Sequence, residues 1–271
     1  MSIAVNPLWL ARNVARSWRQ KMRLQDFFLR LMWIYGAKRG GAERGSRARR
    51  REWTIGFRYP RPVGDIRLRV RANDGADAFI HSEVFEHEYY ALPLAAPPAT
   101  ILDLGANIGM TAVYFSRVFP GAALACVEPI PDNLRLLKRN LELNDVDVAV
   151  FAAAVDVADG HAVMELDPRD YGHRISPAPR RGEDGRIEVA AVSVPTLQRQ
   201  LGWDRIGLLK IDIEGHEAAL LSNDCDWLDC VDALCIECHG EFGEPDLDRL
   251  AHRFGFGAPR AAGGIWLMTR H

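Results

Sequence analysis

Three groups of charged and polar residues stand out as candidates for chemistry. Asp103 comes just before a glycine turn, Gly105-Ala106-Asn107-Ile108-Gly109, and Glu128 follows 25 positions after Asp103. The second group consists of Lys210, Asp212 and Glu214, and the third consists of Glu237 and His239. Within each of these groups the residues occupy every second position of the chain. Such side chains can hold a cationic ligand, orient an acceptor and take up a proton.

The glycine turn narrows the choice of ligand. It lacks the middle glycine of the G-x-G-x-x-G dinucleotide fingerprint, and it lacks the Gly-Lys-Ser/Thr of a phosphate-binding loop. An acid, a tight turn and a second acid suit a ligand with an ammonium group and a ribose but no phosphate. Asp103 would hold the positive end, and Glu128 would accept hydrogen bonds from ribose hydroxyls. We therefore expect S-adenosylmethionine (SAM) as the cofactor.

From Ala99 onward, short apolar runs alternate with amphipathic helical patterns, which predicts a parallel sheet. The expected strands are 101–104, 124–127, 148–152, 208–213, 233–237 and 264–269, and the expected helices are 110–119, 131–143 and one starting near 215. A polar hairpin is expected over 160–194. Ligands of such sheets bind at the carboxyl ends of the strands, where all three groups of candidate residues fall.

Four blocks of sequence, taken in order, resemble the FkbM family of SAM-dependent methyltransferases. They are ILDLGANIGMTAVYF, VEPIPDNLRLLKRNLELN, AVDVADG and LLKIDIEGHEAALL. The resemblance covers roughly residues 79–270. It implies an α/β, class I (Rossmann-like) methyltransferase fold with a seven-stranded, mostly parallel sheet. It also implies methyl transfer, mostly to hydroxyl oxygens of sugars or natural products.

The resemblance also implies roles for individual residues. Asp103, Gly105, Asn107 and Gly109, with Ala106 in the same turn, would line the methionine end of SAM. Glu128 would bind the ribose, and the stretch from Ala154 to Asp156 would lie by the adenine. Lys210, Asp212, Glu214 and Glu217 match the family's fourth-strand block, and Glu237 with His239 resembles its fifth-strand ending.

A hydroxyl acceptor must lose its proton around the transition state, so a general base is needed. We expect His239 or Asp212 to be that base, with Glu214 and Lys210 orienting the acceptor. The alternatives are an internal ion pair for Lys210 and a structural hydrogen bond for His239. His216, just inside a helix start, is expected to be solvated.

The sequence also suggests which residues bind the acceptor and which could bind a metal ion. Residues 79–90 are predicted to form a helix that presents His81, Glu83 and His87 to a ligand, and we expect Glu83 and Glu237 to bind the substrate. Catalysis without a metal is the leading hypothesis. The alternative is that Asp212 and Glu237 bind Mg²⁺ or Ca²⁺ and lower the pKa of the acceptor.

The net charge of −2 hides a split between the N-terminal arm and the rest of the chain. Residues 1–51 carry 13 basic and 2 acidic side chains, a surplus of 11, and the other 220 residues carry 21 basic and 34 acidic ones. We expect three regions: a basic amphipathic helix with an Arg/Gly linker (1–51), a segment of strand and helix that packs on the core (52–98), and the SAM-binding domain (99–271).

The predicted N-terminal helix begins at Asn6-Pro7 and ends near Gly36. Its apolar stripe is Leu8, Ala11, Ala15, Trp18, Met22, Leu29 and Met32, beside a basic stripe of Arg12, Arg16, Arg19, Arg23 and Arg30. Such a helix docks on its own domain, on a second copy of the chain, or on an anionic membrane through residues 7–35. Residues 53–71 alternate and end in a half-exposed strand.

Composition also bears on partners and location. The acidic body argues against a specific nucleic-acid binder and favours a small-molecule acceptor. No stretch reaches the roughly 18–20 apolar residues that span a bilayer, and the first residues show no signal-peptide pattern. With five cysteines, this predicts a cytoplasmic protein, with peripheral contact at the inner membrane face as a variant. Alternative functions are an N- or RNA methyltransferase, and a non-catalytic SAM-fold scaffold docked through its basic helix.

Overall fold

The computed structural model describes residues 23–39, 51–166, 173–175, 185–222 and 224–270. The chain divides into two compact units, Met1–Ala78 and Phe79–His271, which we describe separately. The sequence predicts boundaries after residues 51 and 98 instead, and those boundaries stay predictions. None of the helices in the described ranges is long and apolar enough to cross a membrane.

The first unit packs a helix on a β-hairpin. Helix α2 (Leu24–Arg39) lies against the antiparallel strands β1 (Glu52–Arg58) and β2 (Asp65–Arg71), so the alternating segment forms two strands. Asp26 accepts a hydrogen bond from the Gly56 amide at 2.9 Å, and the Trp33 indole donates one to the Arg71 carbonyl at 2.7 Å. The short helix η1 (Asn73–Gly75) and the start of α4 (Ala76–His81) follow.

Of the apolar stripe predicted for this helix, the described part holds Leu29, which is half-buried, and Met32, which is exposed. Trp33 and Arg30 are buried, with the Arg30 guanidinium 6.0 Å from the Phe57 ring centroid, whereas Leu24, Phe28 and Met32 are exposed. The face of α2 that packs on the hairpin is the one that carries Trp33, whose indole donates to the Arg71 carbonyl. The spacing of apolar residues alone does not reveal this choice of face. The helix also continues to Arg39 rather than ending near Gly36. Residues 1–22 and the linker positions 40–50 lie outside the described residues, and docking through 7–35 stays a prediction.

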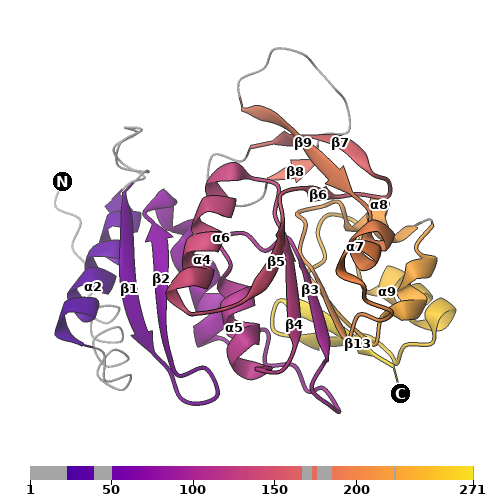
Figure 1. Cartoon of the computed structure of the whole chain (residues 1–271), viewed down its shortest axis with the longest axis horizontal. Helices are drawn as coiled ribbons and strands as arrows, with labels where there is room; N and C mark the ends of the chain where they lie inside the picture. The colour runs from indigo at the N-terminus through magenta and orange to yellow at the C-terminus, as the bar shows by residue number, and fades with distance from the viewer. Residues whose placement is uncertain (1–22, 40–50, 167–172, 176–184, 223, 271) are drawn as a thin grey trace. The chain divides into compact units, whose positions relative to one another are not determined.

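The second unit is built on a seven-stranded sheet in the order β12-β13-β11-β10-β3-β4-β5 (Figure 1). Its strands are β3 (Thr100–Leu104), β4 (Ala123–Val127), β5 (Val148–Phe151), β10 (Leu208–Ile211), β11 (Ala233–Ile236), β12 (Arg260–Ala262) and β13 (Ile265–Thr269). All pairs are parallel except those that involve β13. The mostly parallel, seven-stranded α/β fold that the resemblance implies is therefore confirmed.

Helices flank these strands, and a smaller sheet is inserted before β10. The helices are η2 (Ser82–Glu86), α5 (Met110–Val118), α6 (Pro131–Leu143), α7 (Val194–Leu201), α8 (Glu217–Ser222), η3 (Asp226–Cys230) and α9 (Glu244–Phe254). The inserted sheet has the order β6-β9-β7-β8, from β6 (Ala154–Val155), β7 (Gly160–Glu165), β8 (Arg174–Ile175) and β9 (Arg186–Val192). Strands β7 and β9 pair antiparallel, as expected for the hairpin.

Two expectations about local structure need correction. The helix predicted over 79–90 ends at Glu86, and its last turns are a π-helix, so that His87 is exposed and His81 is buried. Strand β10 ends at Ile211 rather than at 213. Asp212 therefore begins a loop, and its amide still donates to the Leu104 carbonyl at 3.2 Å.

Replacing Gly105 with alanine tests how closely the turn after β3 approaches β10. Gly105 has φ +81°, and a Cβ there would lie 1.8 Å from the Asp212 carbonyl oxygen. We expect Gly105→Ala to lower the free energy of unfolding by about 3 kcal/mol or more, because strain and overpacking add. Urea unfolding measures it. Gly121→Ala, with open space around the position, is the matched control; equal losses in both variants would contradict the close approach.

Candidate functional site

Two adjoining pockets open at the carboxyl ends of β3, β4, β10 and β11. The first pocket is bordered by Glu128, Ala154, Met164 and His216 among others. The second pocket is bordered by Glu83, Tyr89, Glu237 and His239 among others. Gly105, Asn107, Asp212 and Glu214 border both. A ligand in the first pocket can therefore meet a ligand in the second at these shared residues.

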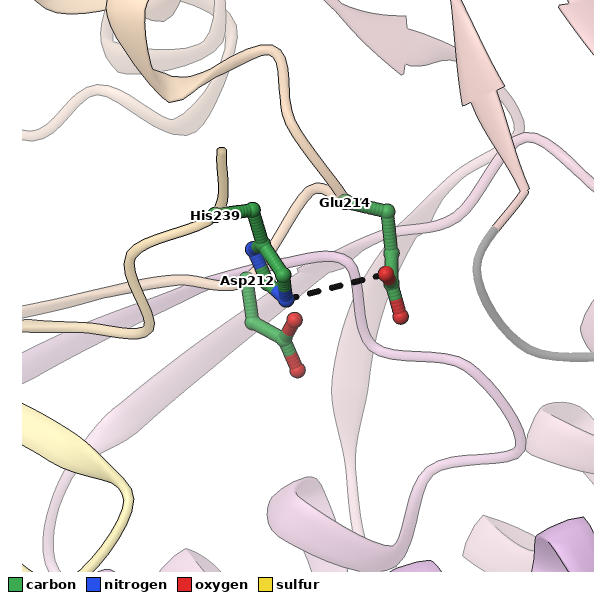
Figure 2. A group of neighbouring side chains, drawn as sticks. All are labelled: Asp212, Glu214 and His239. Carbon is green, nitrogen blue, oxygen red and sulfur yellow. Dashed lines mark ion pairs between the residues drawn. The ribbon is translucent and has the colours of Figure 1, made fainter. Parts of the chain in front are cut away.

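Two carboxylates and an imidazole converge at this shared border (Figure 2). Asp212 and Glu214 follow β10, and His239 follows the neighbouring strand β11, so the parallel pairing brings them together. Ligand atoms of all three lie within 4.8 Å of one another, and His239 Nε2 is 3.6 Å from Glu214 Oε2. The sequence predicted this meeting of the two strand ends.

A buried carboxylate holds the far side of the histidine ring. Glu217 at the start of α8 has no exposed surface, and its Oε1 lies 2.9 Å from His239 Nδ1. This hydrogen bond raises the pKa of His239 to about 9, with further support from the charges of Glu217 and Glu214. The ligand-free imidazole is thus protonated at neutral pH, which fits a hydrogen-bond donor better than the general base expected from the sequence.

Negative charge accumulates around the second pocket. Burial, together with the carboxylates of Asp212 and Glu214, raises the pKa of Glu83 to about 7. Burial and the charge of Asp212 likewise raise the pKa of Glu237 to about 7. Burial is the largest cause of both shifts, and neighbouring carboxylates add to it. A cation bound among them would be stabilised and would favour their ionised forms.

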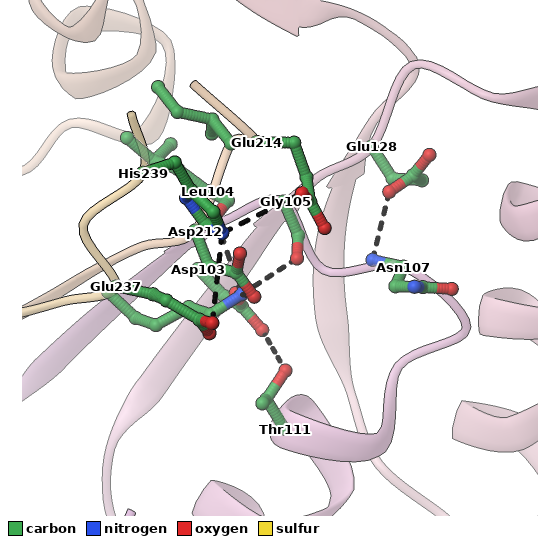
Figure 3. Close-up of polar contacts among 12 residues, drawn as sticks. Asp103, Leu104, Gly105, Asn107, Thr111, Glu128, Asp212, Glu214, Glu237 and His239 are labelled. Carbon is green, nitrogen blue, oxygen red and sulfur yellow. Dashed lines mark hydrogen bonds and ion pairs between the residues drawn. The ribbon is translucent and has the colours of Figure 1, made fainter. Parts of the chain in front are cut away.

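Beneath the turn after β3 lies a buried ion pair. Lys210 Nζ is 3.0 Å from Asp103 Oδ1, and both side chains are almost fully buried. Thr111 donates to the other Asp103 oxygen (Figure 3), and Lys210 Nζ also donates to the Gly105 carbonyl at 2.7 Å. Burial would lower the pKa of Lys210, but the carboxylates of Asp103 and Asp212 outweigh it and raise that pKa.

This pair bears on two roles expected from the sequence. Asp103 borders neither pocket, and its oxygens contact Thr111 and Lys210. Its role in holding a ligand's ammonium group stays a prediction. Lys210 borders the second pocket but forms the internal ion pair that was its alternative interpretation. Its amine positions the turn rather than an acceptor.

Glu128 lies where the sequence expects a ribose-binding acid. Its oxygens accept hydrogen bonds from the Asn107 amide at 2.9 Å (Figure 3) and from the Ile130 amide at 2.8 Å. Burial raises the pKa of Glu128 to about 7, although these amides and the Asn133 side chain oppose the shift. Oε1 accepts from both the Ile130 amide and the Asn133 side chain, whereas Oε2 accepts, among the described residues, only from the Asn107 amide. Oε2 therefore keeps a lone pair for a ligand's hydroxyl group.

The other residues expected to bind the cofactor divide between the pockets. Ala154 borders the first pocket and Ala106 the second. Gly109 borders neither; it precedes α5 with φ +82°, and a Cβ there would press on Leu137. Asp156 also borders neither pocket and instead lies 2.9 Å from His216 Nε2. His216, expected to be solvated, is the residue of this pair that reaches the first pocket.

Sequence reasoning missed the side chains that the insertion and the segment 79–90 contribute. Met164, His173 and Ile175 from the inserted sheet border the first pocket, and Phe79 and Tyr89 border the second. The alternation of Ala162 and Met164 in β7, both buried, was the available signal for an inward face of that hairpin. Tyr89 lies within the helix expected over 79–90 but beyond its observed end at Glu86, so helical periodicity does not give the direction of its side chain.

A family model and the relatives found by sequence comparison indicate the same family for this chain. The family model for the methyltransferase FkbM domain matches residues 103–255. The chain is 28% identical over 214 residues to methyltransferase sdnD of Sordaria araneosa, covering 67% of this chain and 83% of that one. It is 26% identical over 193 residues to 31-O-demethyl-FK506 methyltransferase FkbM of Streptomyces tacrolimicus, covering 58% of this chain and 73% of that one.

Among solved structures, methyltransferase FkbM from Methylobacillus flagellatus is similar with a TM-score of 0.46 and 17% identity. The similarity covers 66% of this chain and 45% of that one, so this chain spans less than half of that protein's length.

Breaking the buried ion pair should destabilise the protein strongly. We expect Lys210→Met to lower the free energy of unfolding by about 3–5 kcal/mol, because it leaves the Asp103 carboxylate buried without its partner. Adding Asp103→Asn should recover part of the loss. Arg139→Met, which breaks the exposed pair with Glu142, is the control and should change stability by less than about 1 kcal/mol. A similarly small loss for Lys210→Met would contradict the buried pair.

Proposed function

This chain belongs to the FkbM methyltransferase family, and on that premise we propose that it transfers a methyl group from SAM to a hydroxyl oxygen of a small polar acceptor, such as a sugar or a natural-product alcohol. The observation that carries the proposal is the pair of pockets that meet at Asp212 and Glu214. A cofactor in one pocket and an acceptor in the other would place the methyl group at that border.

The first pocket supports SAM as the methyl donor. Glu128 offers the free lone pair of Oε2 to a ribose hydroxyl, and Ala154, Val155 and Ile130 offer apolar surface for an adenine ring. The sulfonium would then point toward Asp212 and Glu214, whose negative charges stabilise it. Asp103 does not border this pocket, and its role at the ammonium end stays a prediction.

The second pocket supports a hydroxyl-bearing acceptor. It is bordered by the rings of Phe79 and Tyr89 and by the carboxylates of Glu83, Glu237 and Asp212. Carboxylates accept hydrogen bonds from hydroxyls, and rings pack against the apolar face of a sugar or a polyketide. The relative from Streptomyces tacrolimicus is named for a 31-O-demethyl substrate, which favours oxygen as the accepting atom.

The transfer itself is an in-line displacement in which orientation supplies much of the acceleration. The acceptor oxygen forms a bond to the methyl carbon while the carbon–sulfur bond breaks, and its electron pair stays on sulfur, giving S-adenosylhomocysteine. The hydroxyl proton passes to a carboxylate of the second pocket. Glu237 is placed for this, because it borders the pocket and its carboxylate lies 3.7 Å from His239 Nε2.

The alternatives have less support. An RNA acceptor would bring phosphates to a pocket border that carries Glu83, Asp212, Glu214 and Glu237, which repels them. An amine acceptor fits the charge and is an outcome of the experiment below. A non-catalytic scaffold would have no use for four carboxylates that border one pocket.

The ionisation of Glu128 should control SAM affinity. Its pKa of about 7 means that it is neutral at lower pH and ionised at higher pH, and the ionised form accepts hydroxyl hydrogen bonds better. We expect SAM affinity, measured by calorimetry, to rise as the pH increases through 7. Glu128→Gln should weaken binding by about tenfold and remove this rise. An unchanged pH profile in the variant would contradict the ribose role.

Labelling with SAM that carries a radioactive methyl group tests the reaction. The purified protein should transfer label from SAM to a small molecule in fractionated cell extract, and mass spectrometry should find the methyl group on oxygen. Glu237→Gln should lower turnover by about 10²-fold or more and leave SAM affinity unchanged. The control is Asp248→Asn, an exposed acid on α9. Label on nitrogen or RNA, or no label at all, would overturn the proposal.

A further inference from the structure

We propose that Asp212, Glu214 and His239 form a binding site for a divalent transition-metal ion at the border of the two pockets. The catalytic use of the ion rests on the proposed function, whereas its binding does not. The site differs from the pair expected from the sequence, Asp212 and Glu237, because the residues that converge include the histidine and Glu214.

The spacing of the ligand atoms suits an ion better than direct contacts. His239 Nε2 and Glu214 Oε2 are 3.6 Å apart, which is too long for a hydrogen bond, and all three ligand atoms lie within 4.8 Å of one another. Ligands about 2.1 Å from one ion are separated by about 3.0–4.2 Å, depending on the coordination angle. Small side-chain adjustments would therefore bring the three atoms around one ion (Figure 2).

The orientation of His239 supports the site independently of the two acids. Metal-binding histidines usually donate their other ring N–H to a carboxylate, which directs the remaining nitrogen at the ion. Glu217 Oε1 takes that place at Nδ1, so that Nε2 is left facing Glu214. Glu217 is fully buried and its Oε2 has no hydrogen-bond partner among the described residues. A buried carboxylate needs positive charge close by. The protonated imidazole supplies it in the ligand-free protein, and an ion that replaces the proton on Nε2 would keep positive charge on that ring.

The cationic groups near the border do not balance its carboxylates. Lys210 Nζ lies 3.5 Å from Asp212 Oδ2, but its closer carboxylate is Asp103 at 3.0 Å. Glu83 and Glu237 add two more acids to the wall of the second pocket. The described residues that border the pocket thus hold more carboxylates than cationic groups, and a divalent ion would reduce this excess.

The donor set indicates the kind of ion. Two carboxylates and one imidazole suit Mn²⁺, Fe²⁺ or Zn²⁺ better than Ca²⁺ or Mg²⁺, which prefer oxygen donors throughout. With three protein ligands, positions stay open toward the second pocket. An acceptor hydroxyl bound there would lose its proton more readily, and Glu237 stands beside His239 to receive that proton.

Mn²⁺ binding to the chelator-treated full chain, measured by electron paramagnetic resonance, tests the site without any reaction. We expect one bound Mn²⁺ per chain, with affinity lowered tenfold or more in His239→Ala and Asp212→Asn. Glu217→Gln should lower affinity by about tenfold or more, because it releases the ring. Thermal unfolding would establish that each variant folds, and Asp248→Asn on the surface is the control that should bind as the wild type does.

Several results would overturn the site. They are no bound Mn²⁺, or equal binding in the wild type, His239→Ala and Asp212→Asn. Methyl transfer by the wild type that persists unchanged after chelation would overturn the catalytic role of the ion. Mn²⁺ binding without any O-methylated product would instead count against the proposed function and leave the metal site standing, so the two failures are distinguishable.

Discussion

The buried ion pair between Asp103 and Lys210 is the constraint on which the candidate site depends. It joins β3 to β10 at the edge where both pockets open, and the same lysine amine holds the Gly105 carbonyl. An isolated charge would be very costly at this depth, so each residue requires the other. The pair therefore sets the position of the turn that borders both pockets, and Asp212, two residues beyond Lys210, is set with it.

Above this pair the chemistry is organised around an excess of negative charge. The described residues that border the second pocket include four carboxylates and two cationic groups, and burial together with neighbouring carboxylates raises the pKa values of Glu83 and Glu237 to about 7. The proposed sulfonium cofactor and the proposed divalent ion are both cations, and each would offset part of the negative charge of the carboxylates at the border of the two pockets. The fold thus provides an electrostatic reason for the two ligands proposed to lie next to each other.

The sequence predicted correctly the features that depend on neighbouring residues in the chain, and it failed where contacts between distant residues decide the outcome. Glu128, Asp212 and His239 were placed correctly at strand ends, because buried parallel strands are recognisable as apolar runs and their carboxyl ends meet at one edge. The partners of Asp103 and His216, which are Lys210 and Asp156, were not predicted. Whether a carboxylate faces a ligand or a lysine below it depends on residues far apart in the chain, and the same holds for the pairing of His216 with Asp156. For the same reason the face of α2 was not predicted, because only the hairpin shows that Trp33 is the buried residue.

By itself, the sequence determined the fold family, the order of the main strands and the residues that gather at the carboxyl edge. These depend on local patterns and on four blocks in a recognisable order. Tertiary structure alone decided which of the gathered residues are structural. Asp103 and Lys210 neutralise each other in the interior, whereas Asp212, Glu214 and His239 face one another across a gap. Burial and distance determine that difference, and neither quantity is written in the spacing of residues along a chain.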